Sequence, residues 1–201
     1  PSCTPPLSDP HCISASLQPL HTPERHPHMR VLVTGAAGYI GSHTTKQLLE
    51  QGHTVVAVDN LDRGHRAPMQ LLSERFPNQL DFHEADLGDA DRLADLLAGP
   101  DGAEPAQAVL HFGALAYVGE SVDDPLRYYR NNINAGVALL QAIDRAQTPR
   151  LIFSSSCATY GDPPEHLIPV PEHCPQNPTS PYGRTKLMFE HILTDRKSVV
   201  E

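Results

Sequence analysis

The stretch RVLVTGAAGYIGS, residues 30–42, decides the fold of this chain. Its apolar start predicts a buried strand over 30–35, and the pattern that follows predicts a helix over about 39–51. Between the two stand Gly35, Gly38 and Gly41 at three-residue spacing. Glycines there allow a tight turn and let backbone N–H groups approach a pyrophosphate, which the helix N-terminus stabilises. A purely structural turn has the same glycines, so the motif alone leaves both readings open.

An acidic residue after the second strand favours the ligand-binding reading. The strand predicted over 53–59 ends at Asp59, eighteen residues after Gly41. This is close to the ~20 residues expected for the carboxylate that binds the adenosine ribose of a dinucleotide. Because a 2′-phosphate would meet its negative charge, we expect NAD rather than NADP. Arg63 is the one nearby feature that softens this preference.

The rest of the chain alternates strand and helix patterns. Strands are predicted over 80–87, 106–113 and 150–156, helices over about 89–98, 123–147 and 180–194, and a proline-rich loop over 161–178. Strands joined by helical crossovers imply right-handed connections and a parallel sheet that is covered on both faces. The predicted fold class is therefore α/β, a doubly wound, Rossmann-like parallel sheet.

Composition narrows the function classes. The 201 residues fit one domain, and the net charge of −9 argues against a nucleic-acid or anionic-membrane partner. No apolar run approaches the roughly 20 residues that cross a bilayer. The four cysteines, Cys3, Cys12, Cys157 and Cys174, form no CxxC pair, so we expect no disulfide framework, no metal site and a cytoplasmic location.

Both ends differ from the middle. Residues 1–28 are rich in Pro, Ser and His without periodicity, and Met29 directly precedes the first strand. We expect 1–28 to be a disordered or non-native leader and 29–194 to form the NAD-binding domain. Asp195 to Val200 match the translation of a common sequencing adapter, so we expect 195–201 to be non-native.

Catalytic candidates follow the fifth strand. That strand ends in three serines, of which Ser156 is furthest along and best placed to reach a substrate oxygen, whereas Ser154 and Ser155 are expected to satisfy backbone groups. Tyr182 and Lys186 are spaced to share a helix face. A phenol has an ordinary pKa of about 10, so a tyrosine base needs nearby positive charge, which a lysine supplies.

Two further segments border the expected crevice. Asp86 and Leu87 follow the third strand, where an adenine would lie, although Asp86 is equally suited to capping the helix that begins near Asp89. The fourth strand ends in a small, flexible stretch after Phe112. The carboxyl ends of parallel strands face the ligand crevice, so these loops converge there.

Several motifs together resemble one family. The glycine loop, VDNLDRG, HFGALAYVGES, YYRNN, FSSSCATYGD and SPYGRTKLMFE resemble the UDP-glucose 4-epimerases, which are extended short-chain dehydrogenases/reductases, over Met29 to about Leu193. The resemblance implies bound NAD, interconversion of UDP-glucose and UDP-galactose through a 4-keto sugar, and a homodimer when full length. It implies Tyr182 as proton acceptor, with Lys186 in support and Ser156 at the sugar hydroxyl.

The resemblance also implies a set of cofactor contacts. These are Gly35, Gly38, Tyr39, Ile40, Gly41, Asp59, Asn60, Leu61, Asp62, Arg63, Gly64, Asp86, Leu87, Phe112, Gly113, Ala114, Leu115, Ala116, Asn131, Tyr182 and Lys186. Ala116 stands where some members have lysine, so a side-chain contact to the cofactor phosphates is absent there.

The resemblance leaves alternatives open. The family continues into a carboxy-terminal domain that binds the UDP-sugar, and we expect this chain to be a fragment without it. A 4-epimerase of UDP-xylose, UDP-arabinose or N-acetylated sugars fits the same residues. Dehydratases have Asp-Glu where this chain has Cys157-Ala158, which disfavours them. A non-catalytic NAD-sensing regulator is disfavoured because Ser156, Tyr182 and Lys186 are all present.

Overall fold

The computed structural model describes residues 28–198. Residues 1–27 of the expected leader and residues 199–201 of the expected non-native tail therefore lie outside the described part of the chain.

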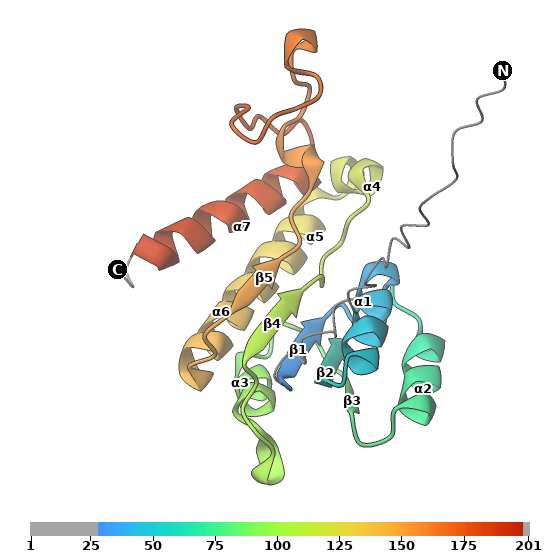
Figure 1. The fold of residues 1–201 in the computed structure, drawn as a ribbon. Coiled ribbons are helices and arrows are strands. Elements are labelled where there is room, and N and C mark those ends of the chain that lie inside the picture. The colour runs from blue at the N-terminus through green and yellow to red at the C-terminus, as the bar shows by residue number, and fades with distance from the viewer. Residues whose placement is uncertain (1–27, 199–201) are drawn as a thin grey trace, which may run out of the picture.

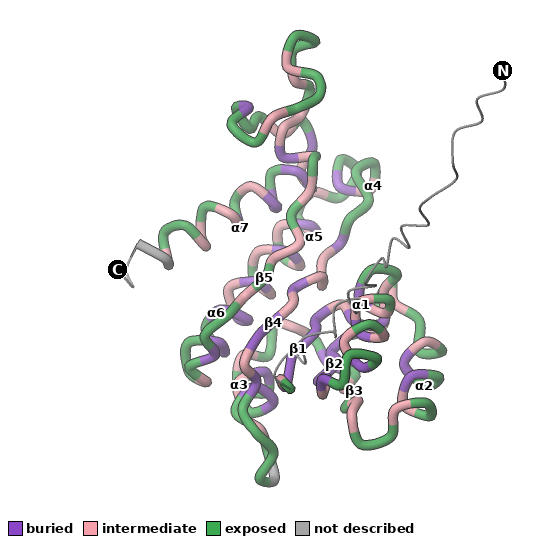
Figure 2. The backbone as a smooth tube through the Cα atoms, viewed as in Figure 1, coloured by how far each residue is buried: buried purple, intermediate pink, exposed green. Residues whose placement is uncertain are grey.

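Five parallel strands form one sheet in the order β3-β2-β1-β4-β5. The strands are β1 (Arg30–Thr34), β2 (Thr54–Asp59), β3 (Leu80–Glu84), β4 (Ala108–His111) and β5 (Leu151–Phe153). Figure 2 shows the buried segments concentrated in the central strands. The apolar runs of β1 and β2 are buried on both faces, as expected for the centre of a parallel sheet. The predicted doubly wound α/β fold is confirmed.

Helices cover both faces of the sheet (Figure 1). On one face α1 (Tyr39–Glu50) and α2 (Arg66–Arg75) pack through Leu49 and Met69 against the odd-numbered residues of β1 and β2. On the other face lie α3 (Ala90–Ala98), α6 (Ala135–Ala146) and α7 (Pro181–Ser198), which contribute Leu93, Leu139 and Phe189 to the second core. Short 3-10 turns occupy Pro100–Gly102, Cys157–Thr159 and Glu165–Leu167.

Two helical segments differ from the prediction. Helix α2 was not predicted, because it buries only Met69 and Leu72 and so leaves a weak apolar pattern. The helix predicted over 123–147 is divided: α4 (Val118–Asp123) comes first, and α5 (Pro125–Tyr129) follows after a break at Asp124. A π turn, Arg130–Asn134, then leads into α6. Asp124 caps α5 by accepting a hydrogen bond from the backbone of Arg127, and Pro125 starts that helix.

The last helix lies near the last strand, which is at one edge of the sheet (Figure 1). Helix α7 continues to Ser198, four residues beyond the predicted end, and the side chain of Arg196 binds Asp144 of α6. Strand β5 forms one edge of the sheet, and its residue Ile152 is 61% exposed. Within residues 28–198 no helix combines the length and apolarity needed to cross a membrane.

Candidate cofactor and catalytic site

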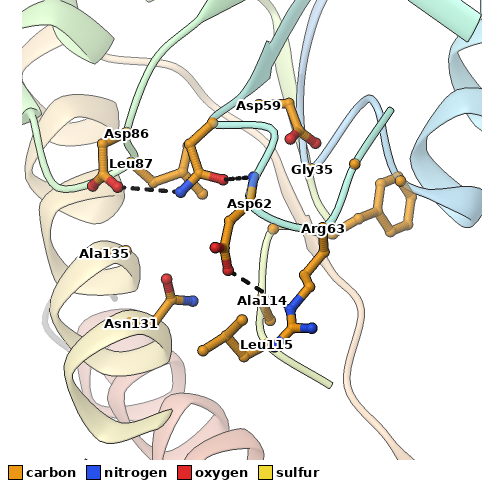
Figure 3. A pocket seen from close by; sticks show the side chains of 15 residues that line it. Gly35, Asp59, Asp62, Arg63, Asp86, Leu87, Ala114, Leu115, Asn131 and Ala135 are labelled. Carbon is orange, nitrogen blue, oxygen red and sulfur yellow. Dashed lines mark hydrogen bonds and ion pairs between the residues drawn. The ribbon is translucent and has the colours of Figure 1, made fainter. Parts of the chain in front are cut away.

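A cavity opens at the carboxyl ends of β1, β2 and β4, where parallel sheets of this class hold ligands (Figure 3). It lies between the glycine loop, the segment after β2, the segment after β4 and the start of α6. Its lining residues are Gly35, Gly38, Asp59, Asn60, Asp62, Arg63, Gly64, Asp86, Leu87, Phe112, Gly113, Ala114, Leu115, Asn131 and Ala135.

The glycine loop is built by close backbone approach. Gly35 has φ of +66°, and a Cβ added to it would lie 2.6 Å from the backbone nitrogen of Gly113. A Cβ on Gly41 would lie 2.0 Å from the carbonyl oxygen of Gly35. No described side chain caps the N-terminus of α1, whose N-cap residue Gly38 lines the cavity. The open N–H groups of this first turn are therefore available to an anion.

Asp59 is a buried carboxylate at the end of β2. Its two oxygens accept backbone hydrogen bonds, one from Ala37 of the glycine loop at 3.0 Å and one from Leu61 at 2.8 Å. Asp59 thus fixes the glycine loop against the segment that follows β2. Because a carboxylate has about four acceptor positions, it keeps capacity for a ligand hydroxyl in the cavity.

Asp86 faces the cavity from the end of β3. It accepts hydrogen bonds from Nδ2 of Asn60 at 3.3 Å and from the backbone of Gly88 at 2.7 Å. The cap of α3 is Asp89, which accepts from the backbone of Arg92. Asp86 therefore does not cap α3 and instead lines the cavity.

Four charged side chains join the segment after β2 to α4 and α5. Arg63 forms an ion pair with Glu120 and lies 3.7 Å from Asp62. Arg127 lies 2.9 Å from both Glu120 and Asp62. We call Asp62, Arg63, Glu120 and Arg127 the charge ring. Glu120 also accepts a hydrogen bond from the buried Tyr128 at 2.8 Å, and this bond and the arginines lower the pKa of its carboxyl.

Asn132, in the π turn, joins the cavity to α7. Its amide donates to the carbonyl of Leu115 at 3.1 Å and to Oγ1 of Thr185 at 3.0 Å, and its oxygen accepts from the backbone of Leu115 at 2.9 Å. Thr185 in turn donates to the carbonyl of Tyr182 at 2.7 Å. Sequence reasoning missed Asn132; its signal was the second asparagine of YYRNN, directly after the predicted Asn131.

Tyr182 and Lys186 share a buried face of α7. Nζ of Lys186 donates to the carbonyl of Ser154 at 2.8 Å and lies 5.9 Å from the ring centroid of Tyr182. The Tyr182 ring packs edge-on against that of Tyr128, 6.5 Å away. Burial lowers the pKa of Lys186 to about 8, whereas the nearby Glu190 acts in the opposite direction.

His111, at the end of β4, stands between the glycine loop and Lys186. Its Nδ1 lies 2.7 Å from Oγ1 of Thr34, which also accepts a hydrogen bond from the backbone of Gly113. Burial, with a smaller contribution from the Lys186 charge, lowers the pKa of His111 to about 3. His111 is therefore neutral at physiological pH and adds no second cation beside Lys186.

The three serines after β5 have different contacts. Ser156 accepts a hydrogen bond from the backbone of Ala158 at 3.2 Å and so caps a 3-10 turn. Ser155 was predicted to satisfy a backbone group, but its hydroxyl instead binds the side chain of Glu190. Ser154 contributes its carbonyl oxygen to Lys186. The Glu190 carboxylate and the Lys186 ammonium of α7 thus both contact the serines that follow β5.

A family model described as the NAD dependent epimerase/dehydratase family matches residues 31–198. The chain belongs to this family. Its cofactor is NAD, and the cavity with the glycine loop and Asp59 is where the fold presents a dinucleotide site.

Individual relatives of this family are similar over most of the chain. The UDP-glucose 4-epimerase uge1 of Schizosaccharomyces pombe is 44% identical over 171 residues, 84% of this chain and 47% of that protein. The UDP-arabinose 4-epimerase 1 of Arabidopsis thaliana is 44% identical over 82% of this chain and 38% of that protein. The chain thus spans half or less of the curated relatives it matches.

A solved structure is likewise similar to most of this chain and is matched over only half of its own length. The UDP-glucose-4-epimerase of Stenotrophomonas maltophila, with bound NAD and formylated UDP-arabinopyranose, has a TM-score of 0.79 and 41% identity. The match covers 87% of this chain and 50% of that one. The predicted membership of the epimerase family is confirmed.

Most of the predicted cofactor residues border the cavity. The exceptions are Tyr39, Ile40, Gly41, Leu61, Ala116, Tyr182 and Lys186. The side chains of Tyr39 and Ile40 point into solvent, and Leu61 packs into the core under α1 and α2. Ala135 lines the cavity but was missed; it stands one helical turn after Asn131, which was its only signal.

Proposed function

We propose that the complete protein is an NAD-dependent 4-epimerase that interconverts UDP-glucose and UDP-galactose. The observation that carries the proposal is the bond from Lys186 to Ser154, which ties the helix bearing Tyr182 to the end of β5 beside the dinucleotide cavity. The similarity to UDP-sugar 4-epimerases over most of the chain supports the reaction class.

The residues of the cavity suit a dinucleotide. In this proposal the uncapped first turn of α1 and the backbone of the glycine loop hold the pyrophosphate. Asp59 accepts the adenosine ribose hydroxyls, and Asp86 with Leu87 borders the adenine. Phe112 to Leu115 and Asn131 line the remaining wall. NAD held there would supply the redox chemistry of the reaction, reversible hydride transfer with C4 of the sugar.

The acid–base chemistry falls to the residues of α7 and β5. Tyr182 takes the proton of the sugar 4-hydroxyl and gives it back after the sugar has turned over. The Lys186 ammonium, held by Ser154 and buried beside the ring, stabilises the negative charge on the tyrosine oxygen. Ser156, which follows β5, orients the sugar hydroxyl.

The choice of NAD over NADP rests on the Asp59 carboxylate and on the pairing of Arg63. Asp59 repels a 2′-phosphate directly. Arg63, a nearby cation that would offset this repulsion if it were free, is already paired with Glu120 and lies beside Asp62. Its charge is therefore neutralised within the charge ring.

A second substrate class, the UDP-pentoses, has equal support from the comparisons. The UDP-arabinose 4-epimerase relative is as similar to this chain as the UDP-glucose 4-epimerase relative, at 44% identity each. The part of the chain that these comparisons cover therefore does not separate a hexose from a pentose substrate.

The proposal is tested by assaying the complete protein, charged with NAD, against a panel of UDP-sugars. We expect conversion of UDP-galactose to UDP-glucose, with a higher kcat/KM than for UDP-arabinose, UDP-xylose and the N-acetylated hexoses. Preference for a pentose would transfer the proposal to the second class. Absence of conversion of every UDP-sugar would contradict both.

A further inference from the structure

The charge ring lies at the border of the cofactor cavity, with two of its four members in the cavity wall. Asp62 and Arg63 line the cavity from the segment after β2, and Leu115 lines it from the segment after β4 (Figure 3). Glu120 and Arg127 extend from α4 and α5, just beyond Leu115. The pairs Arg63–Glu120 and Asp62–Arg127 thus join the cavity wall after β2 to helices that lie 57 and 65 residues further along the chain.

The four charges alternate around a closed cycle. Arg63 binds Glu120, Glu120 binds Arg127, Arg127 binds Asp62, and Asp62 lies beside Arg63. Two positive and two negative charges cancel, and each carboxylate meets two guanidinium groups. In such a network, fixing one side chain also fixes its neighbours, so each pair loses less conformational entropy than an isolated surface pair does.

The ring is anchored to the buried part of the site. Tyr128 is fully buried, donates its hydroxyl to Glu120, and accepts a hydrogen bond from the backbone of Tyr117. The aromatic side chain of Tyr128 packs with Leu115 and Tyr182. The guanidinium of Arg63 also lies 5.1 Å above the ring of Tyr117. Glu120 is therefore the fixed member, and the segment bearing Asp62 and Arg63 is attached to it.

We propose that the charge ring is a latch that retains the dinucleotide in the cavity. A dinucleotide that enters or leaves between the segment after β2 and the helices α4 and α5 must separate Asp62 and Arg63 from Glu120 and Arg127. The ring then slows exchange of the cofactor and makes the exchange rate depend on ionic strength, because its side chains are partly exposed to solvent. This inference rests on the proposed binding of NAD in the cavity.

The variant that tests the latch is Arg127→Gln in the complete protein. Arg127 does not line the cofactor cavity, so its removal breaks two of the ring's contacts without removing a wall residue. Arg127→Lys keeps the charge but not the two-pronged geometry and is expected to fall between the variant and the wild type. Arg75→Gln removes an ion pair with Glu50 that is exposed and does not line the cavity, and it serves as the control.

The measurement is the exchange of bound NAD against labelled NAD at low salt and at about 1 M salt, where screening acts over ~3 Å. At low salt we expect exchange to be about two- to five-fold faster in Arg127→Gln, the range that follows from losing partly exposed ion pairs. High salt should accelerate the wild type and Arg75→Gln more than Arg127→Gln, in which only the Arg63–Glu120 pair still joins the two segments.

Two results would overturn the latch, and they differ in what else they affect. Equal exchange rates and equal salt dependence in the wild type and Arg127→Gln would refute the latch while leaving NAD binding intact. Failure of the wild-type protein to bind NAD would refute both the cofactor site and the latch.

Discussion

Nζ of Lys186 donates a hydrogen bond to the carbonyl oxygen of Ser154, 2.8 Å away. This bond joins a helix near the end of the described chain to the last strand of the sheet. It also holds a cation in a site that is almost closed to solvent, 4.7 Å from the ring centroid of Phe153. The charge that supports Tyr182 is thus kept where its solvation is poor.

This burial predicts a pH dependence of stability. The pKa of Lys186 is about 8 in the folded protein and near 10.5 in the unfolded chain, because burial disfavours the ammonium. Between these values the unfolded chain binds more protons, so the contribution of Lys186 to stability rises with pH. We expect the stability of the wild type relative to Lys186→Met to increase by roughly 2–3 kcal/mol across this window.

Urea unfolding at several pH values measures the effect. Lys46→Met, which removes an ion-paired lysine on the exposed face of α1, corrects for titration elsewhere in the protein. A difference between the wild type and Lys186→Met that stays constant from pH 7 to about pH 10 would show that Lys186 is not desolvated.

Replacing Asp59 tests its role in cofactor choice. In Asp59→Asn we expect NAD to bind more weakly and the ratio of NADP to NAD affinity to rise roughly ten-fold, since like charges about 4 Å apart repel by about 1–4 kcal/mol. A structural role alone, through Ala37 and Leu61, would weaken both cofactors equally. Asp91→Asn makes the same change at an exposed carboxylate of α3 that pairs with Arg145 and does not line the cavity, and it should leave the ratio unchanged.

Asn132→Asp is expected to destabilise the fold. The replacement keeps the shape but removes the two N–H bonds that Asn132 donates to Leu115 and Thr185 in a buried site. We expect a loss of roughly 1–3 kcal/mol, the cost of a buried acceptor left without its donor. Asn134→Asp, at the exposed end of the same π turn, is the matched control. Equal stability of the two variants would mean that the Asn132 contacts carry no energy.

The exposed edge at β5 predicts a solubility effect. Ile152 is 61% exposed on a strand that has a partner on one side only, a combination that favours edge-to-edge association. Ile152→Thr keeps the β-branched shape and should raise the soluble fraction of the 201-residue chain when it is expressed alone. Ile168→Thr removes a similarly exposed isoleucine from the loop after β5 and should have little effect.

The sequence predicted the sheet and much of the cavity because both depend on local signals. Buried apolar runs mark β1 and β2, and Gly35 with Asp59 marks the turn and the carboxylate that meet at their ends. The helix α2 and the division after Asp124 were missed, since they depend on tertiary packing and capping rather than on a strong apolar period. The charge ring was unpredictable because its members come from three separate elements.

Substitution of the proposed base tests the central claim most directly. In the complete protein, Tyr182→Phe removes the hydroxyl while the ring can still pack against Tyr128. We expect the variant to retain NAD but to interconvert UDP-galactose and UDP-glucose ~10²–10⁴ times more slowly than the wild type, the usual cost of losing a general base. Near-normal turnover with bound NAD would contradict the account.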